Sequence, residues 1–170
     1  MEKEIKKYRI ETTRLKNWDY SNFGFYFITI CTKNMKCFFG EIRNEKLIHT
    51  DAGKIIEKEW MKTAEIRKNI TLDEFKVMPN HFHGIIIIDN EYITSNERII
   101  NWKPNSLGTI ANQFKGACTK KIRNDLGAQN FAWQSRYYDR IIRSEPELYN
   151  VRNYIKYNHL NWNEDEYYRK

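Results

Sequence analysis

His81 and His83 are separated by a single residue and open an apolar run that ends at Ile88. Side chains alternate between the two faces of a β-strand, so both imidazoles are expected on one face, about 7 Å apart along it. Two imidazoles in this arrangement can converge on one divalent metal ion. Residues 78–80 include a proline and an asparagine and predict a turn just before the pair. We therefore expect a rigid, buried strand that presents two metal-binding histidines at its open end, with a purely structural role for the pair as the alternative.

A tyrosine in the last part of the chain supplies a second reactive group. The helix expected over residues 144–158 carries an apolar stripe, and Tyr154 and Asn158 share a face at the border of that stripe. A phenol with a pKa of about 10 attacks a phosphorus atom only when the phosphate is held in place and its charge is offset. A metal ion bound by the two histidines would offset that charge. Tyr154 is therefore the predicted nucleophile and Asn158 a predicted oxygen ligand, while packing at the edge of the core is the alternative for Tyr154.

Other tyrosines compete for the role of nucleophile, because the chain contains 11 of them. Tyr137 and Tyr138 lie at the start of an expected strand, where paired aromatic residues pack or stack on bases. Tyr157 points away from Asn158 around the helix, and so away from the expected metal ion. These positions leave Tyr154 as the preferred nucleophile.

The positive charge of the chain is concentrated in its second half. The formal net charge is +7 at pH 7, and nearly all of it falls within residues 99–162. A local positive field of this kind attracts polyanions and speeds their capture, although a solvated surface would carry the same charge. We expect basic residues to hold DNA phosphates and aromatic residues to stack on unpaired bases. The residues predicted for these contacts are Arg14, Lys115, Arg140 and Arg143, with Trp133 and Tyr137 for stacking.

The composition is typical of a folded domain without a membrane or secretory segment. The 170 residues fit one domain, and a hydrophobic content of 41% suffices for a packed core. The aliphatic run at residues 85–88 is far too short to span a bilayer, and residues 1–16 lack the apolar stretch of a secretory signal. The cysteines form no CxxC pair, so a reducing cytoplasm is expected. A zinc hydrolase is disfavoured because there is no HExxH sequence.

Alternating and helical periodicities predict an α+β fold in which an antiparallel sheet carries its helices mainly on one face. Ser106 and Ser144 are predicted helix caps, and an acid and a proline after Ser144 favour a helix start. Residues 89–105 are polar and aperiodic, and predict a loop. The expected strands cover residues 25–32, 37–42, 47–49, 72–77, 82–88 and 138–142, and the expected helices cover residues 51–67, 107–124 and 144–158.

Short segments distributed over most of the chain resemble one bacterial family. They are DYS at residues 19–21, YFITICT at 26–32, FGEI at 39–42, VMPNHFHGII at 77–86, FK at 114–115, WQ at 133–134, YYD at 137–139, IR at 142–143 and YI at 154–155 with Asn158. Each segment alone is a weak signal, whereas all of them in this order are specific. The chain is similar to the REP-associated tyrosine transposases, which are single-tyrosine HUH transposase-like proteins.

The resemblance implies a ferredoxin-like or RRM-like palm with the histidine pair on a central strand and the catalytic tyrosine on a late helix. It implies that His81 and His83 bind Mg²⁺ or Mn²⁺, that Asn158 is the third ligand, and that Tyr154 forms a 5′-phosphotyrosine. The family usually continues with Asn-Pro after the tyrosine helix, whereas His159 follows Asn158 here. His159 is therefore an alternative third ligand.

The substrate that the resemblance implies is single-stranded DNA folded into imperfect palindromic hairpins, which the enzyme cuts and rejoins. We expect a single transposase-like domain over residues 1–170, with an N-terminal arm at 1–24 and a C-terminal tail at 163–170. It would act as a monomer or homodimer in the bacterial cytoplasm, near the nucleoid. A non-catalytic nucleic-acid-binding module with the same fold is the alternative function.

Overall fold

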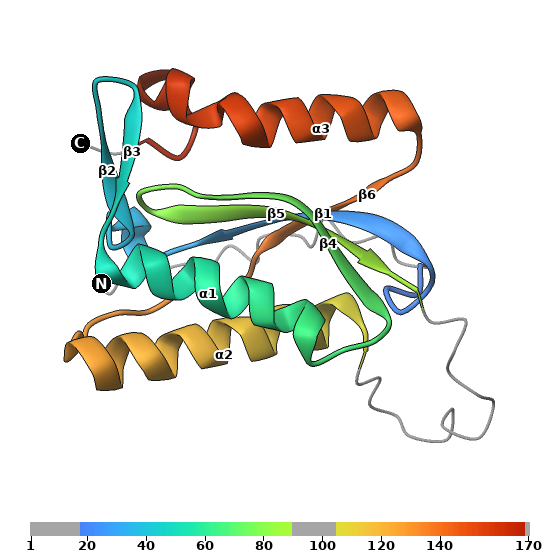
Figure 1. Cartoon of the computed structure of the whole chain (residues 1–170), viewed down its shortest axis with the longest axis horizontal. Coiled ribbons are helices and arrows are strands. Elements are labelled where there is room, and N and C mark those ends of the chain that lie inside the picture. Colours follow the sequence, from blue (N-terminus) through green and yellow to red (C-terminus); the bar gives the residue numbers. More distant parts are fainter. Residues whose placement is uncertain (1–17, 90–104, 169–170) are drawn as a thin grey trace, which may run out of the picture.

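A four-stranded antiparallel sheet forms the centre of the computed structural model, which describes residues 18–89 and 105–168 (Figure 1). Its strands are β1 (Gly24–Cys31), β4 (Ile70–Val77), β5 (His81–Ile88) and β6 (Tyr138–Ile142). They lie in the order β4-β5-β1-β6, so the strands with the most apolar sequences are central and β4 and β6 form the edges. Strand β5 pairs with β1 along its whole length, which places His83 opposite Thr29 and His81 opposite Cys31.

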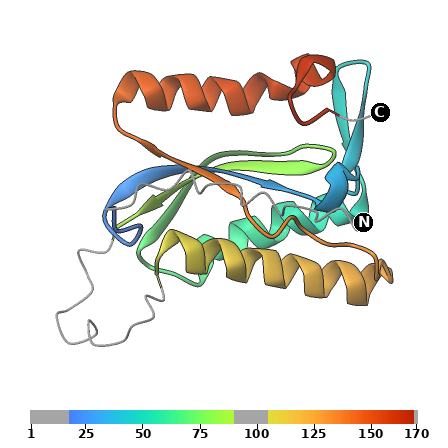
Figure 2. The same ribbon diagram turned by 180° about the vertical axis from the view of Figure 1, so that it is seen from behind.

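Two helices cover one face of this sheet and a third covers the other (Figures 1 and 2). Helices α1 (Asp51–Glu65) and α2 (Leu107–Leu126) pack against each other on one side, and α3 (Glu145–Tyr157) crosses the opposite side. The predicted α+β class, an antiparallel sheet with its helices mainly on one face, is therefore confirmed.

The helix caps form as predicted from local sequence. The side chain of Ser106 accepts a hydrogen bond from the backbone N–H of Thr109, and that of Ser144 accepts one from Glu147. These bonds satisfy N–H groups that have no partner within the helix. Helix α2 ends at Gly127, whose φ of 66° is the left-handed conformation that glycine adopts without strain.

The segment after β1 differs from its prediction. Residues 33–34 were expected to form a hairpin turn into a strand at 37–42, but Lys33–Met35 forms a short 3-10 turn instead. Asn34 and Met35 both have a positive φ, of 58° and 55°, so the chain turns away from β1 rather than folding back along it. Strand β2 (Gly40–Arg43) begins later and pairs with β3 (Lys46–His49) in a separate two-stranded sheet.

The alternation of side chains along β5 decides which residues meet α3. Phe82 packs between Trp60 and Phe114 in the core beneath α1 and α2, with ring centroids 4.7 and 5.3 Å away. His81 and His83 alternate with Phe82 and therefore face the opposite side, where α3 lies. The sequence alternation thus places both histidines between the sheet and the helix that carries Tyr154.

Some of the expected organisation lies outside the described residues. Arg14 and most of the N-terminal arm (1–24) and of the loop at 89–105 fall in this part of the chain. At the other end, a 3-10 helix, η3 (Asn158–Glu164), continues from α3. Within residues 18–89 and 105–168, no helix combines the length and apolar character needed to cross a membrane.

Candidate active site

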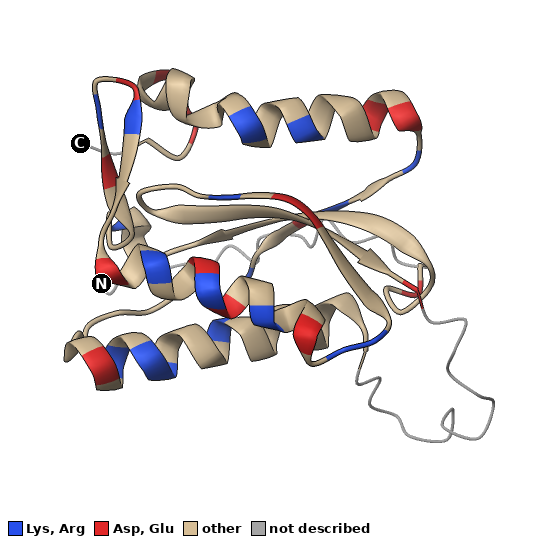
Figure 3. Cartoon of the chain, viewed as in Figure 1, with Lys and Arg blue, Asp and Glu red and all other residues tan. Residues whose placement is uncertain are grey.

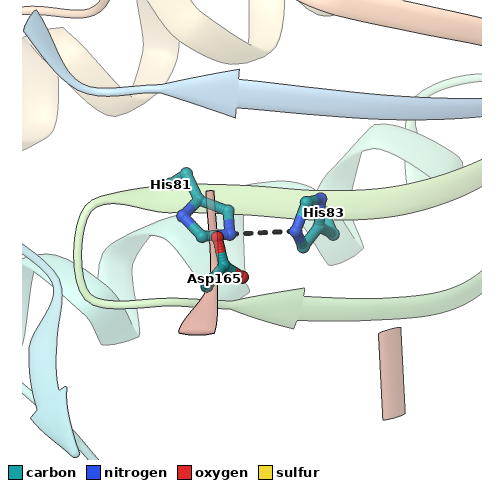
Figure 4. A group of neighbouring side chains, drawn as sticks. All are labelled: His81, His83 and Asp165. Carbon is teal, nitrogen blue, oxygen red and sulfur yellow. Dashed lines mark hydrogen bonds between the residues drawn. The ribbon is translucent and has the colours of Figure 1, made fainter. Parts of the chain in front are cut away.

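His81 and His83 lie at the start of β5 with neither side chain exposed to solvent. Their Nε2 atoms are 2.9 Å apart, which is hydrogen-bond distance (Figure 4). An ideal strand separates such residues by about 7 Å along its axis, so the rings are turned toward each other. The structure therefore brings the two predicted histidines together, with both Nε2 atoms directed at one point.

Two buried polar side chains hold the far edges of these rings. Oδ1 of Asn80 lies 2.8 Å from Nδ1 of His81, and Oγ1 of Thr29 lies 2.8 Å from Nδ1 of His83. Asn80 is fully buried and Thr29 is 2% exposed. Partners of this kind fix the orientation of metal-binding histidines. Thr29 and Asn80 thus turn both Nε2 atoms inward.

Tyr154 projects from α3 toward the same point. Its hydroxyl lies 3.2 Å from Nε2 of His83, and its ring packs edge-on against Phe27. Burial, together with the carboxylates of Asp165 and Glu166, raises the pKa of Tyr154. The phenol is therefore neutral at pH 7, and its ionisation would require a nearby positive charge.

A carboxylate that the sequence did not predict completes the cluster. Asp165 follows η3, and its carboxylate lies with the ring nitrogens of His81 and His83 in a group whose ligand atoms are all within 4.8 Å of one another (Figure 4). Its Oδ1 accepts a hydrogen bond of 2.7 Å from the backbone N–H of Tyr167. Its buried Oδ2 has no hydrogen-bond partner in the described part of the chain. A buried carboxylate oxygen without a donor is costly, so a cation beside it would be stabilised.

The two residues predicted as third ligand lie in different surroundings. Asn158 is 6% exposed and lies beside Asp165, whose pKa burial raises and the Asn158 side chain lowers in part. Its Nδ2 forms no hydrogen bond of ordinary geometry within the described residues. His159 instead contacts β4, with its Nδ1 2.9 Å from Nζ of Lys76. Asn158 therefore belongs to the surroundings of Asp165, whereas His159 is engaged with the edge of the sheet.

The donor set fits a divalent metal ion. Burial lowers the pKa of His83 to about 3, and burial together with the charge of His83 lowers that of His81 well below its ordinary value. Both rings are therefore neutral at pH 7, which is the form that binds metal. Nitrogen from two imidazoles with oxygen from a carboxylate and an amide suits Mn²⁺ well and is compatible with Mg²⁺.

A groove of about 900 Å³ runs from Tyr154 between β6 and α3. Tyr138 and Arg140 line it, and both also line a second hollow that reaches Arg143. Nη2 of Arg140 forms an ion pair of 2.7 Å with Glu147, which borders both hollows. Lys and Arg occur in all three helices (Figure 3), so charge alone does not mark a binding face. The groove, in contrast, is lined by Thr29 and Tyr154, which both contact His83.

The other predicted DNA contacts have structural partners. Nζ of Lys115 donates to two backbone carbonyls of the segment before β6. The Trp133 ring packs in the aromatic core, and its Nε1 donates a hydrogen bond of 3.1 Å to the carbonyl of Lys115. Tyr137 packs half-buried against the same core. DNA contacts by these residues stay predictions, as does the contact by Arg14, which lies outside the described residues.

A sequence model of the family described as "Transposase IS200 like" matches residues 20–158 of the chain. The chain therefore belongs to the IS200-like transposases and is a DNA transposase. The predicted family is confirmed, and the match includes both histidines, Tyr154 and Asn158. Asp165 lies beyond the matched residues.

Two further comparisons show which proteins this chain is similar to. An uncharacterized protein of Haemophilus influenzae is 33% identical over 164 residues, which cover 91% of each chain. The solved structure of a REP-associated tyrosine transposase bound to a REP hairpin superposes with a TM-score of 0.59 and 16% identity. That match covers 89% of this chain and 74% of the solved chain, and at this identity it shows the fold.

Sequence reasoning missed Asp165 for a structural reason. Its approach to the histidines depends on how η3 turns the chain after α3, and no periodicity encodes that turn. The same segment carries Tyr167, whose ring centroid lies 4.6 Å from that of His81. The only sequence signal was a run of acidic residues at 164–166, beside several aromatic residues, in a segment expected to be a tail.

Proposed function

We propose that this transposase is a metal-dependent single-stranded DNA endonuclease and strand transferase, with Tyr154 as its nucleophile. The observation that carries the proposal is the distance of 3.2 Å between the Tyr154 hydroxyl and Nε2 of His83. His83 belongs to the cluster with His81 and Asp165, whose atoms fit a divalent ion. A phenol beside such a cluster meets the main requirement for attack on a phosphodiester.

Mg²⁺ or Mn²⁺ would be held by Nε2 of His81 and His83 and by an oxygen of Asp165 or Asn158. When bound, the ion supplies Lewis-acid polarisation of the scissile phosphate. The protein orients the ligands beforehand through the partners of the two Nδ1 atoms.

The covalent step exchanges one phosphate ester for another. The Tyr154 oxygen forms a bond to phosphorus, the bond to the 3′-oxygen breaks in line with it, and that oxygen takes up a proton to leave as a 3′-hydroxyl. The phenolic proton passes to water, since Tyr154 is 41% exposed and borders the open groove. The 5′-phosphotyrosine retains the ester bond, so attack by a 3′-hydroxyl can reverse the step and join strands without ATP.

The groove supports a single strand as the substrate. Arg140 and Arg143 would contact the phosphates, and Tyr138, 38% exposed on the edge strand, would stack on a base. The solved relative was bound to a REP hairpin, and we propose hairpin-bearing single-stranded DNA as the ligand of this chain. The chain would act as a monomer or homodimer. The stem of the DNA hairpin would lie outside the groove.

Covalent trapping tests the proposal. The full-length protein incubated with hairpin-bearing single-stranded DNA and Mn²⁺ should give a protein–DNA adduct on a denaturing gel. Tyr154→Phe should abolish the adduct, whereas Tyr149→Phe should retain it, because Tyr149 lies on the same helix and is 67% exposed. An adduct that persists in Tyr154→Phe would assign the nucleophile to another residue.

The hydrogen bonds made by the buried histidines favour one alternative, a nucleic-acid-binding module in which the pair is structural. Such a module would bind the same DNA without metal and would not cut it. Replacement of His81 and His83 by alanine separates the two functions, provided that circular dichroism shows a folded protein. A transposase loses cleavage in this variant, whereas a binding module has no cleavage to lose and keeps its affinity.

A further inference from the structure

A third hollow, of about 410 Å³, adjoins Tyr154 at the C-terminal end of α3, and we call it the η3 hollow. It shares Tyr154 and Glu166 with the groove that Arg140 lines. Its other lining residues come from the end of α3, from η3 and from the residue that follows η3. Its volume lies in the range of ligand pockets. A single strand with a phosphate at Tyr154 therefore has one hollow for the nucleotide on each side of that phosphate.

The lining of the η3 hollow disfavours a phosphate and suits a base. Among the described residues that line it, three are acidic and none is a lysine or an arginine. Asp165 belongs to the metal-ligand cluster, which leaves the carboxylates of Glu164 and Glu166 for a ligand. Like charges repel, so the DNA backbone is disfavoured here. Carboxylates only accept hydrogen bonds, and the N–H donors of DNA lie on the edges of its bases.

Asn158 is an independent sign that a ligand enters this hollow. The residue lines the hollow and is 6% exposed, and its Nδ2 forms no hydrogen bond of ordinary geometry within the described residues. A buried N–H donor without an acceptor is costly, so a ligand oxygen beside it would be stabilised. The oxygen and the NH₂ group of an amide point in different directions. Asn158 can therefore offer Nδ2 to a base while its Oδ1 stays available to a metal ion.

Tyr157 adds an aromatic surface to the same hollow. Its side chain lines the hollow and is 47% exposed. Unpaired bases stack on exposed aromatic rings whatever their identity, so this ring would hold a base without selecting it. Selection is left to the hydrogen-bonding groups around the base.

Guanine matches these groups better than the other three bases. Its Watson–Crick edge carries two adjacent donors, N1–H and the N2 amino group, beside one acceptor, O6. A single carboxylate can accept from both donors at once, and O6 can accept from an amide NH₂ group. Adenine and cytosine present one amino group on this edge, and thymine presents one N–H between two carbonyl oxygens, which a carboxylate repels.

We propose that the η3 hollow binds a guanine next to the scissile phosphate. Tyr157 stacks on the base, Glu164 accepts from N1–H and N2, and Nδ2 of Asn158 donates to O6. Glu164 is the carboxylate assigned because it borders this hollow and not the groove, whereas Glu166 borders both. The inference rests on the proposed function and names the base that it selects.

Sequence selection by metal-free protein tests the choice of base. The probe is hairpin-bearing single-stranded DNA whose unpaired nucleotides are randomised, and EDTA keeps it uncut. Sequencing of the bound fraction should show guanine enriched over thymine by about tenfold at one position. Equal recovery of the four bases at every position, or enrichment of another base alone, would overturn the proposal.

Matched substitutions of glutamate locate the selection. Glu164→Gln keeps the length of an exposed side chain but leaves one acceptor oxygen, so guanine should fall to about the level of adenine and cytosine. Glu65→Gln removes the same charge from the end of α1, on the other face of the sheet, and should leave the enrichment unchanged. Guanine enrichment that survives Glu164→Gln would place the selection elsewhere and overturn the proposal.

Substitutions of Tyr157 test the stacking surface. Tyr157→Phe keeps the ring and should retain the affinity for a probe with guanine at the selected position. Tyr157→Ala removes the ring and should lower that affinity by about tenfold. Fluorescence anisotropy measures both variants, and equal affinity in Tyr157→Ala and Tyr157→Phe would remove Tyr157 from the site.

Reaction of the same randomised probe with Mn²⁺ separates two failures. We expect the DNA recovered on Tyr154 to have carried guanine next to the cleaved bond. If the adduct forms without any base preference, the endonuclease stands and the guanine site is wrong. If Glu164 selects guanine but no adduct forms with Mg²⁺ or Mn²⁺, the hollow binds guanine and the endonuclease of the proposed function is wrong.

Discussion

At the scale of single residues, Tyr154 and the two histidines share an environment that favours their neutral forms. Neutral imidazole is ready to bind a metal ion, whereas a neutral phenol is a poor nucleophile. Burial raises the pKa of Tyr154, so alkaline pH alone does not activate it. A divalent cation at the histidines offsets this effect because it favours the phenolate.

Metal removal should therefore abolish covalent chemistry at any accessible pH. With EDTA, we expect no adduct between pH 7 and pH 9, and addition of Mn²⁺ should restore it. The measurement is the fraction of protein shifted on a denaturing gel. Adduct formation in EDTA that grows with pH would show that Tyr154 ionises without a metal ion.

The buried histidines also make stability depend on pH. The pKa of His83 is lowered to about 3 and that of His81 is lowered well below its ordinary value. As the pH falls, the unfolded chain therefore binds protons at these histidines at a higher pH than the folded chain does. The stabilisation is complete above about pH 6.5 and declines as the pH falls below it. Between pH 7 and pH 5 the free energy of unfolding should drop by about 2 kcal/mol from His83, and the lowered pKa of His81 acts in the same direction. Urea unfolding of metal-free protein at several pH values measures this free energy. A value that does not change with pH would contradict a buried, neutral histidine pair.

Asp165 and Asn158 are the two competing oxygen ligands, and substitution separates them. Asp165→Asn should lower the affinity for Mn²⁺ by about tenfold or more, because the charge and the unpaired Oδ2 are lost. Glu166→Gln is the matched control, since it removes a neighbouring carboxylate outside the metal cluster. Calorimetry with unchanged affinity in Asp165→Asn would leave Asn158 as the third ligand.

At the scale of elements, helix α3 must hold Tyr154 within reach of β5. Arg152 anchors this helix to β4 through two bonds to Asp73, of 2.9 and 2.5 Å. The hydrogen bond from Arg152 lowers the pKa of Asp73 and so favours its charged form. Lys76 adds a second link, from Nζ to the carbonyl of Lys156.

Loss of the Arg152 anchor should affect chemistry more than stability. The ion pair is partly exposed, so Arg152→Ala should cost no more than about 1 kcal/mol of unfolding free energy. The rate of adduct formation should fall several-fold, because Tyr154 lies on the same helix and loses its fixed position. Lys54→Ala, which breaks an exposed ion pair with Asp51 in α1, is the control. Equal rates in both variants would show that α3 is held by its apolar face alone.

The elements that sequence predicted best are those whose periodicity is local. β5 is a continuous apolar run and α3 begins at a clear cap, so the placement of His81 on a strand and of Tyr154 on a helix followed from them. β2 was misplaced because two consecutive residues with positive φ precede it, and Lys33-Asn34 alone did not reveal this. Asp165 was missed because its position beside the two histidines depends on a turn after α3 that only tertiary packing defines.

At the scale of the whole molecule, the two faces of the sheet have different roles. The α1–α2 face holds the larger core, and its Glu59 is paired with Lys62 of the same helix and with Lys121 of α2. The α3 face holds the metal-ligand cluster and the groove. Strand β6, which lines the groove with Tyr138 and Arg140, is an edge strand of the sheet.

DNA binding should therefore depend on the groove and not on the charge of the molecule as a whole. Arg140→Ala should weaken single-stranded DNA binding and reduce the slope of log affinity against log salt by about one. Lys54→Ala removes the same charge from the other face and should change neither quantity. Fluorescence anisotropy at several salt concentrations measures both. Equal losses in the two variants would place the strand elsewhere.

Peptide mapping of the trapped adduct tests the central claim most directly. The full-length protein, allowed to react with hairpin-bearing single-stranded DNA and Mn²⁺, is digested with nuclease and protease and analysed by mass spectrometry. The account predicts a nucleotide attached through its 5′-phosphate to Tyr154, in the peptide that carries α3. Attachment to Tyr138, Tyr157 or Tyr167, or through a 3′-phosphate, would contradict it.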